Sequence, residues 1–162
     1  MNQLTHILTK TEFPAHALRI ELTESALMTS LESVWAILNT LRSQGIRITI
    51  DQFGTGYSSL TQLHHLPIDS LKLDTALIES LHENIHSSTI IRAMNTMAQQ
   101  LQLQTIAAGI ETLEQIHQLR VLGCDYGQGH KISSPLTLDE LDRFLTQRHQ
   151  ILVAEICPHP AG

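Results

Sequence analysis

Three short segments of the chain alternate apolar and polar residues, the pattern of β-strands that bury one face. In the clearest of them Ile46, Ile48 and Ile50 alternate with polar residues, and the run ends on a carboxylate, Asp51. Two further strands are expected later in the chain. The five expected strands cover residues 18–23, 46–51, 70–74, 105–110 and 126–132.

Segments with the apolar spacing of helices separate these strands. Three of them begin with a capping box, in which a Thr is followed three residues later by Glu or Gln, at Thr29, Thr112 and Thr137. The helix after Thr29 carries an apolar stripe that includes Trp35, and we expect this stripe to be buried. The expected helices cover residues 2–11, 30–44, 59–65, 88–101, 113–122 and 138–149.

Five strand–helix units with short connections predict a parallel sheet with right-handed crossovers. The first three strands are apolar on one face only, whereas a sheet covered by helices on both faces would be apolar on both. Charges on an inward face are costly unless they are paired or bind a metal, so the pattern indicates a polar site inside a barrel. We therefore predict an α/β fold that forms a partial TIM-type (β/α) barrel over residues 1–150, with a tail at 151–162. The polar face carries Arg19, Glu21, Arg47, Thr49, Asp51, Lys72 and Asp74.

The composition limits the partners of the protein. Its net charge of −6 argues against nonspecific DNA binding, which requires a basic surface. The sequence has no apolar run near the roughly 20 residues of a membrane span, and its N-terminus lacks the pattern of a secretory signal. Cys124 and Cys157 are isolated and lack metal-binding spacing, so we expect free thiols and a cytoplasmic location.

Residues suited to metal or phosphate binding gather at the C-terminal ends of the predicted strands, where α/β barrels place their active sites. Hard oxygen ligands that converge on one rim suit Mg²⁺ or Mn²⁺, and such an ion can activate water for attack on a phosphodiester. Each residue alone is explained as well by a solvated charge or a loop cap. Their recurrence on successive strands favours a shared site. They are Glu21, Glu24, Asp51, Lys72, Asp74, Glu111 and Gln128.

A second metal motif, at residues 82–86, has the His-Glu-x-x-His spacing of zinc proteases. That chemistry needs both His side chains on one face of a helix, together with a third ligand. Here the residues read as the loop and N-cap before the helix expected at 88–101, so a zinc protease is not predicted. His130 is interpreted as a surface residue rather than a ligand.

Residues 51–60 read Asp-Gln-Phe-Gly-Thr-Gly-Tyr-Ser-Ser-Leu, which resembles the Asp-Asp-Phe-Gly-Thr-Gly-Tyr-Ser-Ser motif of EAL domains, the bacterial cyclic di-GMP phosphodiesterases. Residues 21–25, Glu-Leu-Thr-Glu-Ser, and 72–74, Lys-Leu-Asp, are similar to two further motifs of that family. The similarity continues through 107–112 and 123–129. The resemblance implies the barrel fold and the substrate of the family.

The resemblance also implies a role for each matching residue. Glu21 and Asp51 would bind the metal, and Glu24 would steady the Gly-rich loop. Lys72 would be the catalytic residue that contacts the attacking water or the phosphate. The residues expected to contact the substrate or to support the ligands are Gln52, Asp74, Glu111 and Gln128.

The departures from the family pattern concern its catalytic chemistry. Ala108 stands where the family has a catalytic Glu, and a methyl group can neither bind a metal nor accept a proton. Gln52 replaces the second Asp, so the site loses an anionic ligand. A (β/α)₈ barrel needs about 250 residues. The Glu-Ala-Leu strand and a strand with an Asn ligand are therefore expected to lie before residue 1.

These features predict a truncated and degenerate EAL domain with little or no phosphodiesterase activity and a regulatory or protein-interaction role. Mg²⁺ or Mn²⁺ and cyclic di-GMP would bind weakly, and an open sheet would favour a homodimer or a higher oligomer. Two alternatives stay open at this point. One is an active phosphodiesterase completed by a partner chain, and the other is a fragment of a longer EAL protein.

Overall fold

A single parallel sheet of five strands organises the molecule. The computed structural model describes residues 2–28, 31–54, 63–81 and 85–148. The strands are hydrogen-bonded in chain order and every pair is parallel, which confirms the predicted α/β sheet. They are β1 (Arg19–Thr23), β2 (Arg47–Phe53), β3 (Ser70–Leu73), β4 (Gln104–Ala108) and β5 (Tyr126–Gln128).

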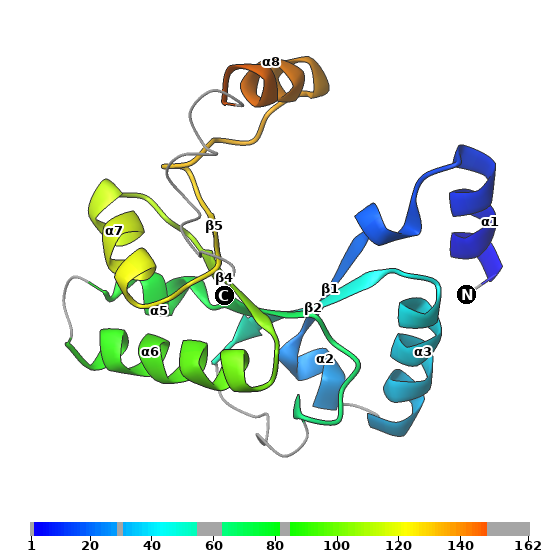
Figure 1. Ribbon diagram of the computed structural model, residues 1–162, viewed down its shortest axis with the longest axis horizontal. Coiled ribbons are helices and arrows are strands. Elements are labelled where there is room, and N and C mark those ends of the chain that lie inside the picture. The colour runs from blue at the N-terminus through cyan, green and yellow to red at the C-terminus, as the bar shows by residue number, and fades with distance from the viewer. Residues whose placement is uncertain (1, 29–30, 55–62, 82–84, 149–162) are drawn as a thin grey trace, which may run out of the picture. The chain divides into compact units, whose positions relative to one another are not determined.

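Described helices connect β1 to β2, β3 to β4 and β4 to β5, and α2, α3 and α6 lie on one side of the sheet (Figure 1). Two short helices, α2 and α5, were absent from the sequence prediction, because five residues are too few to show a helical period. Helix α6 begins earlier than expected, so His86 lies within it. The helices are α1 (Asn2–Thr11), α2 (Glu24–Met28), α3 (Leu31–Ser43), α5 (Thr75–Glu79), α6 (Ile85–Gln100), α7 (Leu113–Val121) and α8 (Leu138–Arg148), with a 3₁₀ turn at Ala15–Ala17.

Several sequence expectations fall on residues that the structure does not describe. The Thr29 cap, most of the helix expected at 59–65 and His82 lie outside the described residues, as does Cys157. The chain divides into two compact units, residues 1–132, which contain the sheet, and residues 133–162, which contain α8. Among the described helices, none has both the length and the apolar character that crossing a bilayer requires.

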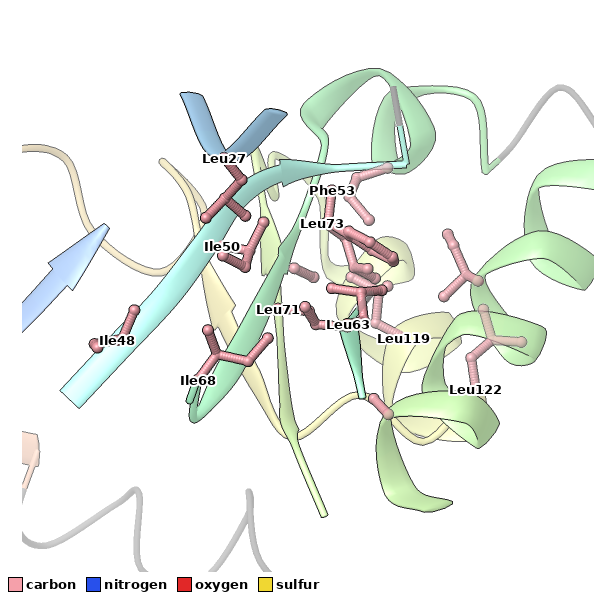
Figure 2. Close-up of a cluster of buried hydrophobic side chains, with 14 of the residues drawn as sticks. Leu27, Ile48, Ile50, Phe53, Leu63, Ile68, Leu71, Leu73, Leu119 and Leu122 are labelled. Atoms are coloured by element: carbon pink, nitrogen blue, oxygen red, sulfur yellow. The ribbon is translucent and has the colours of Figure 1, made fainter. Parts of the chain in front are cut away.

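The apolar face of the sheet forms the core of the first unit (Figure 2). Ile48 and Ile50 of β2 and Leu71 and Leu73 of β3 are fully buried there, together with Leu27 of α2. Strand alternation alone places these side chains on one face and the charged side chains on the other. The buried face therefore fixes the position of the polar face and its residues.

A β-bulge near the end of β2 makes the strand longer than predicted. Ile50 pairs with Leu71 and Phe53 with Leu73, so β2 has one more residue than β3 between these pairs. The bulge contains Asp51 and Gln52, and Gln52 has a left-handed backbone with φ of 57°. Phe53 thereby returns to the buried face, and the strand runs to residue 53 rather than ending at 51. Bulges re-aim side chains beside functional sites.

Trp35 was expected in the buried stripe of α3, and this expectation is wrong. Its side chain is 50% exposed, whereas Leu38 and Leu41 of the same helix are buried. The indole Nε1 donates a hydrogen bond to the backbone carbonyl of His65 at 3.1 Å. The indole N–H thus finds its hydrogen-bond partner outside the core. A hydrophobicity pattern does not distinguish such an exposed Trp from a buried one.

Strand β5 is shorter than predicted, because the chain leaves the sheet after Gln128 and packs against Ile110. The Ile110 amide donates to the Gln128 carbonyl, and the Lys131 amide donates to the Ile110 carbonyl, both at 3.0 Å. Gly129 lies between these bonds. A Cβ at this position would lie 2.2 Å from the Ile110 backbone nitrogen and oxygen, so only glycine allows so close an approach.

Cys124 is a free thiol packed against the core. Its Sγ donates to Asn95 Oδ1 at 3.8 Å. Burial raises the pKa of the Cys124 thiol, because the thiolate would lose hydration there. We therefore expect Cys124 to react slowly with alkylating agents.

Candidate functional site

The polar face of the sheet holds three of the predicted site residues together. Glu21 lies on β1, Asp51 at the end of β2 and Lys72 on β3. The register pairs Glu21 with Thr49 and Thr23 with Asp51, which places both carboxylates on the same face of neighbouring strands. The bulge and the parallel register bring Lys72 to them from the third strand.

Lys72 forms the centre of this cluster. Its Nζ lies 2.8 Å from Glu21 Oε2 and 4.0 Å from Asp51 Oδ1. The Lys72 side chain is 12% exposed, against 40% for Glu21 and 29% for Asp51. One ammonium therefore lies between two carboxylates, and the cluster as a whole carries one excess negative charge.

A layer of buried hydroxyls lies beside the cluster, and the sequence analysis missed one of its members, Ser70. Arg19 Nη1 donates to Ser70 Oγ at 3.0 Å, and Ser70 Oγ is 2.6 Å from Thr49 Oγ1. Ser70 and Thr49 are fully buried. The signal was available, because Ser70 has the same strand parity as Lys72. These bonds tie β1, β2 and β3 together next to the charged residues.

Glu24 contacts the start of the Gly-rich loop. It is the first residue of α2, and its side chain is almost completely buried. Its Oε2 accepts a hydrogen bond from the Gly54 amide at 3.2 Å. Gly54 has φ of +104°, and an added Cβ there would lie 2.7 Å from Met94 Cε. The rest of the loop, residues 55–62, is outside the described part of the chain.

The other predicted residues lie further from the charged cluster or have a local partner. Asp74 is not on β3 as expected, because the strand ends one residue earlier and its Oδ1 caps α5 by accepting from the Ala76 amide at 2.9 Å. Glu111 and Gln128 are exposed, and in the described residues neither forms a hydrogen bond or ion pair with Glu21, Asp51 or Lys72. Gln52 lies in the bulge, where its backbone N–H donates a hydrogen bond to Asp51 Oδ1.

Ala108 ends β4 and pairs in register with Gln128. It has the parity of Ile106, which pairs with Lys72, so the Ala108 methyl lies on the polar face of the sheet. A residue that could bind metal or move a proton is thus missing from this position on β4.

The donor set fits one divalent cation rather than two. Glu21 and Asp51 supply hard carboxylate oxygens, and Mg²⁺ is commonly held by one or two carboxylates together with several waters. Within the described residues, no group of three or more His, Cys, Asp or Glu side chains could hold a metal. A pair of neighbouring cations would need more negative ligands than these two carboxylates.

Comparison with known proteins identifies the family of the chain. A family model described as "EAL domain" matches residues 1–135. The chain is 39% identical over 145 residues to cyclic di-GMP phosphodiesterase NbdA of Pseudomonas aeruginosa, an alignment that covers 90% of the chain and 18% of NbdA. The chain thus spans less than a fifth of the length of this relative.

Solved structures agree with the family match. The EAL domain of Mycobacterium smegmatis DcpA has a TM-score of 0.83 and 32% identity, over 90% of this chain and 66% of that one. A manganese and cyclic di-GMP complex of Klebsiella pneumoniae BlrP1 has a TM-score of 0.74 and 29% identity, over 79% of this chain and 33% of BlrP1. With five parallel strands in one sheet and a family match over most of its length, the chain belongs to the EAL domain family.

Proposed function

We propose that this chain is a degenerate EAL domain that hydrolyses cyclic di-GMP slowly or not at all. In this proposal it acts in cyclic di-GMP signalling through protein contacts or weak nucleotide binding. The observation that carries the proposal is the composition of the polar face, where Glu21 and Asp51 share one lysine and Ala108 presents a methyl group.

The chemistry of phosphodiester hydrolysis explains why these residues matter. A bound divalent cation would lower the pKa of a water molecule and offset negative charge on the phosphate. Glu21 and Asp51 are the residues that would hold it, with Lys72 beside them to contact a phosphate oxygen. Ala108 cannot accept a proton, and Gln52 adds no charge with which to retain a second cation.

Two similar proteins, one solved with cyclic di-GMP and one named for its hydrolysis, support nucleotide recognition as part of the proposal. BlrP1 was solved with manganese and cyclic di-GMP, and NbdA is described as a cyclic di-GMP phosphodiesterase. We extend to this chain a weak affinity for the same nucleotide and for Mg²⁺ or Mn²⁺. A cytoplasmic location belongs to the same proposal, because a reduced compartment keeps thiols such as Cys124 free.

The test is a hydrolysis assay with purified protein, cyclic di-GMP and either Mg²⁺ or Mn²⁺, with product separated by chromatography. We expect no turnover above that of the Glu21→Ala variant, which removes a carboxylate of the cluster. An active EAL domain serves as the positive control. Turnover within about tenfold of that control would contradict the proposal, because the loss of a proton-transfer group costs about 10²- to 10⁴-fold.

The retained cluster favours one rival function, an active phosphodiesterase completed by a partner chain. Glu21, Asp51 and Lys72 still meet on one face, which is the arrangement a working site would need. A partner that adds strands beside β1 or β5 could supply further ligands. Turnover that appears only when a second protein is added, and that Glu21→Ala abolishes, would favour this rival.

A further inference from the structure

The Lys72 ammonium lies beside the two carboxylates that would bind a metal ion. The ammonium is 2.8 Å from Glu21 Oε2, and the Lys72 side chain is largely buried. Its ion-pair partners in the described residues are Glu21 and Asp51, the same two carboxylates that would bind a divalent cation. The cluster therefore already contains one positive charge between its two negative charges.

We propose that Lys72 is the resident counterion of this cluster and competes with divalent cations for Glu21. This inference rests on the proposed function only in taking Glu21 and Asp51 as the metal-binding carboxylates. A cation bound to both carboxylates lies about 2.0–2.6 Å from their oxygens. An ammonium that stays in hydrogen-bond contact with Glu21 Oε2 would then be close enough to the ion to repel it strongly.

A cation bound to both carboxylates would therefore weaken or displace the ion pair between Lys72 and Glu21. The flexible four-carbon stem of lysine allows the ammonium to withdraw, but the ion pair is lost and the displaced charge stays near the metal. Because the Lys72 side chain is 12% exposed, solvent screens this pair less than a pair on the open surface. The competition lowers the affinity for every divalent cation, whether or not nucleotide is present.

Calorimetric titration of the whole chain with Mn²⁺, without nucleotide, tests the competition. We expect Lys72→Met to bind Mn²⁺ at least about fivefold more tightly than the unmodified chain, since an ion pair no longer opposes binding. Lys72→Arg keeps the positive charge and should not show this gain. Lys10→Met removes the same charge from an exposed position on α1 and is the matched control.

Two further measurements keep the outcome decisive. Circular dichroism and a melting curve establish that Lys72→Met is folded, and the double variant Lys72→Met/Glu21→Gln should lose the gained affinity. Equal or weaker Mn²⁺ binding by a folded Lys72→Met protein overturns the proposal, as does a gain of the same size in Lys10→Met. Hydrolysis of cyclic di-GMP by the unmodified chain would instead overturn the proposed function and leave this order of affinities unchanged.

Discussion

At the scale of a residue, the buried Glu24 carboxylate forms a hydrogen bond that holds the start of the Gly-rich loop. Only 4% of Glu24 is exposed, and a buried carboxylate is costly unless it accepts hydrogen bonds. Its Oε2 accepts from the Gly54 amide, at the point where β2 becomes the Gly-rich loop. The contact joins α2 to the loop that follows Asp51. The family resemblance implies that Glu24 steadies that loop. This hydrogen bond is the contact through which it would do so, and it can be tested.

We predict that Glu24→Ala lowers the free energy of unfolding by about 2 kcal/mol, because it leaves the Gly54 amide without its charged acceptor. Urea denaturation measures the change. Glu79→Ala is the control, since Glu79 is an exposed carboxylate on α5, and we expect it to stay within about 0.5 kcal/mol of the unmodified chain. A loss no larger than that of Glu79→Ala would show that the bond contributes little.

Strand alternation explains which site residues could be found from sequence. Glu21, Asp51 and Lys72 were placed on one face because each alternates with apolar residues along its strand. The structure brings both carboxylates to within 4.0 Å of Lys72 Nζ. Asp74 has the same parity but lies just beyond the strand, so parity did not predict its capping role. Their functional roles stay predictions.

At the scale of the element, the register of β1 against β2 creates an unusual juxtaposition. Arg19 pairs directly with Arg47 on the polar face. Arg19 donates to Ser70 Oγ, whereas Arg47 is exposed, and in the described residues neither forms an ion pair. Like charges directly opposite each other destabilise a strand pair. The register therefore predicts a site where an opposite charge would stabilise the sheet.

We expect Arg47→Glu to raise the free energy of unfolding by about 0.5 kcal/mol relative to Arg47→Gln, because only the Glu variant gains an attraction to Arg19. Urea denaturation at low salt measures the difference. The same comparison in 1 M salt should shrink the difference, since screening weakens an exposed pair. If the Glu variant is the less stable of the two at low salt, the two side chains do not meet as the register indicates.

The elements themselves were predictable wherever their pattern was long enough. The capping box at Thr112 and Gln115 is present with both of its hydrogen bonds, as its sequence indicates. The bulge at Asp51 and Gln52 was not predictable, because it depends on how β2 pairs with β3 rather than on either strand alone. The end of β5 was missed for a similar reason. Gly129 ends it through close approach to Ile110, a contact that local sequence does not reveal.

At the scale of the whole molecule, β1 and β5 are the edge strands of the sheet in the part of the chain that the structure describes. In the described residues β1 and β5 each pair with one neighbour, so the backbone N–H and C=O groups on their outer sides have no strand partner. A closed barrel removes such edges by pairing its first and last strands. An open edge is a template for pairing with another strand, and natural proteins usually cover it.

We therefore predict that the chain forms a homodimer, or a higher oligomer, that buries at least one of these edges. Two-fold symmetric dimers are the commonest assembly when one surface of a chain is complementary to itself. Size-exclusion chromatography with light scattering at micromolar concentration measures the mass. Hydrogen exchange then locates the interface, because pairing at an edge should slow exchange of outward amides in residues 19–23 or 126–128 as the protein concentration rises. An assembly joined elsewhere would leave exchange at both edges independent of concentration. A stable, folded monomer would show that both edges stay open or are covered within one chain, and the prediction would be wrong.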